Sequence, residues 1–92
     1  MKFEWDKNKE SINIDKHGLD FKLSSHLFKS KMVFYEDQRK SYNEKRYIGY
    51  GVVSERCINI VFTVRKRTIR VISLRRANKS EIRKYNKAIK SY

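Results

Sequence analysis

"CINIVFTVRKRTIRVISLRR", residues 57–76, reads as two β-strands joined by a short basic turn. Four apolar side chains share one face of the first strand, 57–65: Ile58, Ile60, Phe62 and Val64. The side chains between them share the other face: Asn59, Val61, Thr63 and Arg65. This two-residue period is typical of a strand with one buried face. Only residues 66–67 separate it from the second strand, 68–76, so we expect the two strands to run antiparallel.

The strand pattern continues outward from this hairpin. Val71 and Ile72 are apolar on successive positions, which favours a central place in the sheet for 68–76. Residues 32–37 and 46–54 read as further strands, and short connections link the last three strands into an antiparallel meander. Gly49 and Gly51 inside 46–54 indicate a bulge or a close approach of another segment.

Helical signals flank the strands. Residues 2–5 alternate as a short strand, and Asp6 can cap a helix that runs to about His17, before Gly18 ends it. Asp20 is placed to cap a second short helix. Asn78 and Glu81 have the spacing of a capping box and open a C-terminal helix. The apolar stripe of that helix is Ile82, Tyr85 and Ile89. We therefore predict an α+β protein with one domain over residues 1–92.

The net charge of +13 is unevenly distributed. Residues 63–92 hold eleven Lys or Arg and a single acid, Glu81, whereas residues 1–62 hold twelve Lys or Arg and nine acids. A field of one sign attracts polyanions such as nucleic acid, an acidic protein or an anionic membrane surface.

Several classes of protein are excluded. Residues 1–5 are too short and polar for a signal peptide, and no apolar run approaches the ~20 residues of a membrane span. The single cysteine, Cys57, cannot form an internal disulfide, and we expect it to be a buried thiol in a reducing, cytoplasmic protein. The acids are scattered and there are only two histidines, so we expect no metal site and no cofactor.

Cleavage of RNA without a metal suits the remaining residues. The protein must take a proton from the 2′-hydroxyl, neutralise the phosphorane and protonate the 5′ oxygen. A Lys or His can move protons, and arginines can hold phosphate oxygens. Four side chains share a stripe of the first predicted helix: Lys9, Asn13, Lys16 and His17. Five tyrosines are candidates for stacking on bases: Tyr35, Tyr42, Tyr47, Tyr50 and Tyr85.

The chain resembles the BrnT family of type II toxins, in the RelE-like superfamily. The matching segments are FEWD at 3–6, Lys9, Asn13, KHGLDF at 16–21, Arg46, IG at 48–49, TVR at 63–65, RVISLRRA at 70–77, Glu81 and Tyr85. The resemblance implies a RelE-like fold with two N-terminal helices, an antiparallel sheet and a C-terminal helix. It also implies an endoribonuclease that arrests translation. The expected partner is a BrnA-like antitoxin, whose ribbon-helix-helix part binds operator DNA.

The family match and the strand positions together give the candidate site. The predicted catalytic residues are Lys16, His17, Arg46, Arg65 and Arg75. The predicted RNA-binding residues are Arg70, Arg76 and Tyr85. Lys16 is the first candidate for proton transfer or phosphate contact, while His17 can equally serve the helix end. Arg70 can equally belong to a cross-strand ion pair, and Glu81 is expected to act as a cap.

Two other functions remain open at this point. The chain can be a basic module that binds nucleic acid without cleaving it, or a protein whose basic face serves to dock an acidic partner. The first alternative predicts strongly salt-dependent binding with no RNA product. The second is contained in the toxin hypothesis, because one surface can bind RNA and be blocked by an antitoxin.

Overall fold

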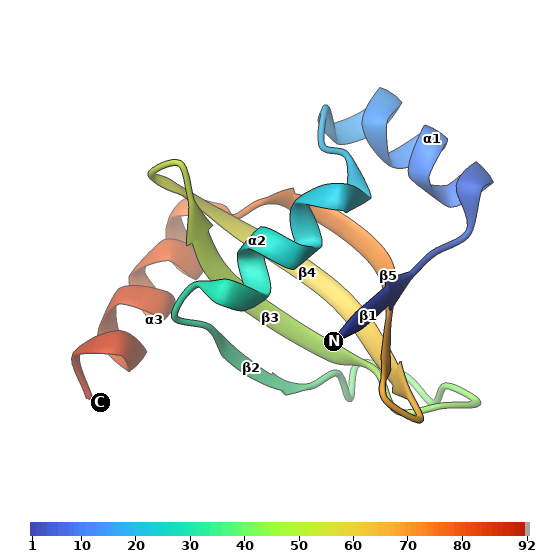
Figure 1. The fold of residues 1–92 in the computed structure, drawn as a ribbon. Helices are drawn as coiled ribbons and strands as arrows, with labels where there is room; N and C mark the ends of the chain where they lie inside the picture. The colour runs from blue at the N-terminus through green and yellow to red at the C-terminus, as the bar shows by residue number, and fades with distance from the viewer. Residues whose placement is uncertain (92) are drawn as a thin grey trace.

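The computed structural model describes residues 1–91, so Tyr92, the last residue of the predicted domain, lies outside the described residues. Figure 1 shows the elements around one sheet. The strands are β1 (Lys2–Glu4), β2 (Val33–Glu36), β3 (Tyr47–Val53), β4 (Arg56–Arg65) and β5 (Thr68–Arg76). The helices are α1 (Lys7–His17), the 3-10 turn η1 (Phe21–Leu23), α2 (Ser24–Lys29) and α3 (Lys79–Lys90). The predicted α+β class and order of elements are confirmed. No helix within residues 1–91 has the length and apolar character to cross a membrane.

The sheet has the order β1-β5-β4-β3-β2 and is mixed, which corrects the prediction of a purely antiparallel sheet. Strands β2 to β5 form the expected antiparallel meander. β1, however, runs parallel to β5, with Phe3 opposite Ile69 and Glu4 opposite Arg70. The cause is that two helices separate β1 from the meander, so no hairpin fixes its direction.

An extra residue in β5 changes which side chains share a face. Val61 pairs with Ser73 and Phe62 pairs with Val71, so Ile72 has no partner on β4 and forms a β-bulge. The adjacent apolar residues Val71 and Ile72 therefore reflect this bulge as well as the position of β5 between β1 and β4. Beyond Ile72 the alternation of faces is reversed relative to a regular strand.

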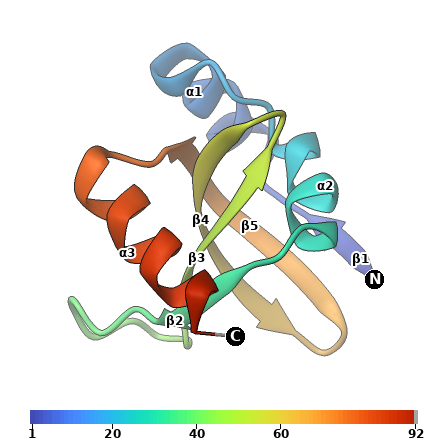
Figure 2. The ribbon, with the colours of Figure 1, turned by 90° about the vertical axis from the view of Figure 1, so that its left-hand side faces the viewer.

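The two faces of the sheet carry different helices, as Figure 2 shows. Phe21 of η1 and Leu27 of α2 pack on one face, against a core that includes Ile60 of β4. On the other face, Tyr85 of α3 packs against Ile48 and Tyr50 of β3. The half-buried Cys57 packs against this second cluster, and burial raises the pKa of its thiol, as suits a packing residue. Val64, expected on the apolar face, is 48% exposed at the end of β4.

Helix α1 packs beside β5, and Asn13 makes the connection. Its Oδ1 accepts a hydrogen bond from the Leu74 N–H at 3.1 Å, and its Nδ2 donates to the Leu19 carbonyl at 3.0 Å. Asn13 is 5% exposed, so it does not belong to a solvent-facing functional stripe with Lys16 and His17. β1 pairs only with Thr68 to Arg70, and α1 supplies a polar partner to β5 beyond that point.

The predicted helix ends are confirmed. The Asp6 side chain accepts from two backbone N–H groups at the start of α1, and Gly18 ends the helix at φ 69°. Asp20 caps η1, which precedes the short α2, so the second predicted helix begins as a 3-10 turn. The two glycines of β3 mark a close approach: a Cβ on Gly51 would lie 2.9 Å from Leu27 Cδ1.

We predict that Asn13→Ala lowers the free energy of unfolding by about 2 kcal/mol, because it leaves the buried Leu74 N–H without a partner. Urea denaturation measures the change. The control is Asn8→Ala on the exposed side of α1, expected to stay within about 0.5 kcal/mol of the parent. Equal effects of the two substitutions would contradict a structural role for the Asn13 side chain.

Candidate active site

Five arginines lie on the side of the sheet that carries α3. Strand alternation places Arg65 there from β4 and Arg70 from β5, opposite the face that packs on α2. The bulge at Ile72 brings Arg75 to the same face, although five positions separate it from Arg70. Arg46, just before β3, and Arg39, in the loop after β2, complete the set. These five arginines therefore belong to one face of the sheet.

A hollow of about 290 Å³ lies beside α3 on this face. Its lining residues come from β2 to β5, the loop after β2 and α3: Tyr35, Arg39, Ile48, Tyr50, Asn59, Val61, Ser73, Arg75 and Glu81. Most of the surface that lines the hollow is polar, and the two arginines, Arg39 and Arg75, can face an anionic group placed in it. Tyr35 is 51% exposed and stacks on Tyr50, with ring centroids 6.4 Å apart.

The Glu81 carboxylate is the centre of the hydrogen bonds in the hollow. Arg75 donates to both of its oxygens at 2.8 Å. The Tyr50 hydroxyl donates to Oε2 at 3.0 Å, and Asn59 Nδ2 donates to the same oxygen at 3.3 Å. Glu81 also closes the capping box of α3, since Oε1 accepts from the Asn78 N–H at 2.9 Å. The cap expected from the sequence is therefore confirmed, and the same side chain also holds an arginine.

These contacts shift the pKa values of the groups in the hollow. The bidentate Arg75 guanidinium, helped by the Asn78 N–H and Tyr50, lowers the pKa of Glu81 to about 2. Burial, followed by neighbouring hydrogen bonds, raises the pKa of the Tyr50 hydroxyl. Glu81 is thus an anion and Tyr50 a neutral donor at pH 7. The Glu81 hydrogen bond also raises the pKa of Arg75, which stays cationic.

Arg39 is held by Asp37 at the β2 edge of the hollow. The guanidinium donates to both Asp37 oxygens at 2.8 Å, and the Tyr42 hydroxyl donates to Oδ2 at 3.0 Å. The Arg39 hydrogen bonds hold the pKa of Asp37 well below its usual range. The Arg39 side chain is 67% exposed, so its outer surface is open to an incoming anion.

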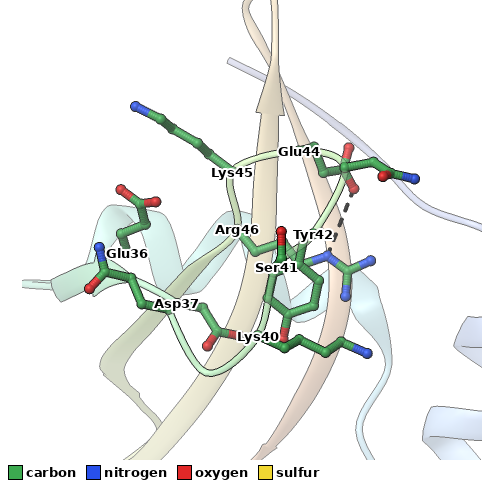
Figure 3. Close-up of a pocket in the computed structure, with 10 residues that line it drawn as sticks. Glu36, Asp37, Lys40, Ser41, Tyr42, Glu44, Lys45 and Arg46 are labelled. Carbon is green, nitrogen blue, oxygen red and sulfur yellow. Dashed lines mark hydrogen bonds and ion pairs between the residues drawn. The ribbon is translucent and has the colours of Figure 1, made fainter.

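A second cluster lies in the loop between β2 and β3, drawn in Figure 3. The Glu44 carboxylate lies 3.0 Å from Arg65 Nη2 and 3.8 Å from Arg46 Nε. The Arg46 guanidinium carbon lies 4.2 Å from the centre of the Tyr42 ring, a cation–π contact. At the β1 side of the sheet, Arg70 Nη1 donates to Glu4 at 2.8 Å, so its cross-strand ion pair is confirmed.

Four of the five arginines of the face fall into two groups, and the fifth, Arg70, is held by Glu4 at the β1 side. Arg75 pairs with Asn59 in the register of the sheet, and Arg65 lies six residues further along β4. At ~3.3 Å per residue the two positions are ~20 Å apart. Arg75 and Arg39 therefore line one hollow, while Arg46 and Arg65 share another, and both groups belong to one face.

The other residues predicted for the site lie elsewhere. Lys16 and His17 are exposed in the last turn of α1, and neither lines the hollow beside α3. Arg76 pairs with Ile58, whose side chain belongs to the core on the α2 side. Tyr85 is 7% exposed, and its hydroxyl donates to the Lys31 carbonyl at 2.7 Å. Its packing role is clear, whereas catalytic or RNA-binding roles for these four residues stay predictions.

Sequence reasoning missed two members of the hollow. Arg39 lies in a polar loop with no periodicity, and Asn59 reads as an ordinary polar position in β4. The available signal for Asn59 was an amide in the middle of an apolar run, since a buried amide needs partners. Arg39 could have been found only by pairing it with Asp37 two residues before it.

The arrangement favours binding of phosphate. Arginines present paired N–H groups that match phosphate oxygens, and four of the five arginines here are already held by a carboxylate: Arg39, Arg65, Arg70 and Arg75. The fifth, Arg46, lies over the Tyr42 ring. Within residues 1–91 no three His, Cys, Asp or Glu side chains are grouped as a metal site. The fold and this face define a small basic α+β protein with a set of arginines whose charge suits a polyanion.

The comparison with protein families identifies the chain. The family model described as a ribonuclease toxin, BrnT, of a type II toxin-antitoxin system matches residues 5–81. The chain belongs to this family. A search of curated proteins found no match. The resemblance seen in the sequence is thus confirmed, and the family's description gives the class of activity.

We predict that Glu81→Gln lowers the free energy of unfolding at pH 7 by roughly 2 kcal/mol. The lowered pKa of Glu81 means that the folded state gains stability above about pH 4.5 and loses it as the pH falls toward about 2. The difference between wild type and Glu81→Gln should shrink over that range. Urea denaturation between pH 2 and 7 tests this, with Glu36→Gln, an exposed acid on β2, as control. A difference independent of pH would refute the role of the ionised carboxylate.

Proposed function

We propose that the chain is an endoribonuclease toxin that cleaves RNA without a metal ion, in the hollow beside α3. The supporting observation is the pair of arginines that line the hollow, Arg39 and Arg75, each oriented by a carboxylate, with the exposed Tyr35 beside them. Membership of the BrnT family supports the reaction class. We further propose that residues 1–92 form one toxin domain with a RelE-like layout.

Charge stabilisation is the main chemical contribution that the hollow offers. The 2′-hydroxyl attacks the adjacent phosphate, the P–O5′ bond breaks, and the products are a 2′,3′-cyclic phosphate and a 5′-hydroxyl. Arg75 and Arg39 face the position where negative charge develops on the phosphorane. Tyr35 offers a ring on which a neighbouring base can stack.

Proton transfer needs a group whose pKa is nearer to neutrality than those in the hollow. Glu81, with a pKa of about 2, is a weak base, and none of the lining residues is a histidine or a lysine. Lys16 and His17 therefore stay as predicted proton carriers. Because they lie on α1, this role requires that one of their side chains reach the 2′-hydroxyl or the 5′ oxygen of the phosphate held in the hollow.

We propose a BrnA-like antitoxin as the partner. Its acidic groups would compete with RNA for the arginine face, the side of the sheet that carries the five arginines described above. The family's type II toxin-antitoxin description supports an antitoxin, and the net charge of +13 supports an acidic one. Contact with operator DNA would be indirect, through the ribbon-helix-helix part of that antitoxin. Cellular RNA as substrate places the toxin in the cytoplasm.

The second candidate is a nucleic-acid-binding module without catalysis. The observation that favours it is the absence of a neutral-range acid or base from the lining of the hollow. This module would bind RNA with steep salt dependence and leave it intact.

We predict that the purified chain cleaves mRNA in the presence of EDTA and leaves 2′,3′-cyclic phosphate ends. The reaction should be unchanged by added Mg²⁺, because the arginines carry the charge stabilisation. Mass spectrometry of the fragment ends measures the outcome. Intact RNA that is nevertheless bound would select the non-catalytic module, and loss of cleavage in EDTA would refute metal independence.

We predict that Arg75→Gln lowers the cleavage rate about 100-fold, as expected for removing one donor from a developing oxyanion. The matched control is Arg56→Gln, an exposed arginine at the start of β4 that is expected to keep full activity. Circular dichroism checks that both variants fold.

We predict that Lys16→Ala relieves growth arrest if Lys16 carries protons, while the chain stays folded. Plating of cells that express each variant measures toxicity, with Lys7→Ala in the first turn of α1 as the matched control. Full toxicity of Lys16→Ala would confine the active site to the arginine face.

A further inference from the structure

We propose that the loop pocket between β2 and β3 binds a second phosphate of the same RNA, several nucleotides from the bond that is cleaved. This inference rests on the proposed ribonuclease function. The residues that carry it are Lys40, Tyr42, Glu44, Arg46 and Arg65, which line one pocket of about 370 Å³.

The pocket is positively charged and its cations share one acid. Glu44, the acid that lines this pocket, accepts a hydrogen bond from Arg65 Nη2 at 3.0 Å. It also lies 3.8 Å from Arg46 Nε, a distance too long for a hydrogen bond. Arg46 Nε is buried and has no hydrogen-bond partner among the described residues. A buried guanidinium N–H without an acceptor favours an incoming oxygen ligand. A phosphate can satisfy both arginines at once, with Glu44 moving aside.

The guanidinium of Arg46 is held in place before any ligand binds. It lies over the Tyr42 ring at 4.2 Å, and the Tyr42 hydroxyl is itself anchored on Asp37. The ammonium of Lys40 lies 5.3 Å from the same ring. Figure 3 shows the side chains of Tyr42, Lys40 and Arg46 near one another in this loop. An oriented cation loses less entropy on binding than a free side chain does.

The loop is fixed to the sheet. The Thr63 hydroxyl of β4 donates to the Lys45 carbonyl at 2.7 Å, and the Asp37 N–H donates to the Arg46 carbonyl at 2.7 Å. These bonds set the position of Arg46 relative to β4. The Arg65 side of the pocket thus lies ~20 Å along β4 from the Asn59 position that pairs with Arg75, on the same face.

The need for two phosphates defines the substrate class. A dinucleotide has a single internucleotide phosphate, so when that phosphate occupies the hollow beside α3 no second phosphate is left for the loop pocket. A longer single strand can occupy both places, as proteins that bind single strands commonly do over several nucleotides. The loop pocket therefore selects RNA chains of sufficient length.

The test compares two uncleavable ligands. One is a 2′-O-methyl RNA of about twelve nucleotides, measured by fluorescence anisotropy over a range of salt concentrations. The other is a 2′-O-methyl dinucleotide, measured by NMR titration. The variants are Arg65→Gln, Arg46→Gln and Glu44→Gln, with Arg56→Gln on the same strand as Arg65 as control.

We expect Arg65→Gln and Arg46→Gln each to weaken binding of the long RNA about tenfold. Each should also reduce the slope of log affinity against log salt by ~0.7. Glu44→Gln should strengthen binding of the long RNA several-fold, because it removes the competing carboxylate. Dinucleotide binding should be unchanged in all three variants, and Arg56→Gln should behave as wild type.

Two results would overturn the second phosphate site. One is unchanged affinity of Arg65→Gln for the long RNA. Because the Arg65 side chain is exposed, we expect this variant to fold normally, so its affinity reports on the pocket alone. The other is an equal loss for the dinucleotide, which would put the loop at the scissile phosphate. Both results can be distinguished from failure of the proposed function. In that case the wild-type chain would bind the long RNA but would not cleave the same RNA without its 2′-O-methyl groups.

Discussion

The Glu81 carboxylate joins helix α3 to the strands that carry the candidate site. It closes the first turn of α3, receives two hydrogen bonds from Arg75 on β5, and accepts from Tyr50 on β3 and Asn59 on β4. One ionised group therefore fixes a helix to three strands and sets the direction of an arginine. Because the side chain is mostly buried, each of these bonds is shielded from competing water.

The same design repeats around the face on a smaller scale. Asp37 holds Arg39, Glu4 holds Arg70, and Glu44 lies between Arg46 and Arg65. Exposed ion pairs contribute little to stability, so their value here is orientation of the guanidinium groups. Under the proposed function, a phosphate chain that reaches this face meets cations that are already oriented, and it has to compete with these carboxylates for them.

Local signals in the sequence predicted the individual helices and strands, but they did not predict how these elements assemble. The hairpin of β4 and β5, the cap at Asp6, the stop at Gly18 and the capping box at Glu81 all depend on residues close in the chain. The parallel pairing of β1 depends on contacts more than sixty residues away, and neither periodicity nor turn length reports them. The candidate site shows the same limit. Strand alternation indicated the face of Arg65, whereas the network on Glu81 and the distance between Arg65 and Arg75 needed the folded sheet.

The bulge at Ile72 determines which face of the sheet the Arg75 side chain occupies. Arg70 and Arg75 are an odd number of positions apart, so an unbroken strand would aim them at opposite sides of the sheet. A strand that kept Ile72 but paired without the bulge would turn Arg75 toward the α2 core and Leu74 toward the opposite face. Loss of Ile72 itself would leave four positions between the two arginines and keep both on one face. The number of residues between Arg70 and Arg75 and the presence of the bulge therefore have to change together if the arginine surface is to be kept.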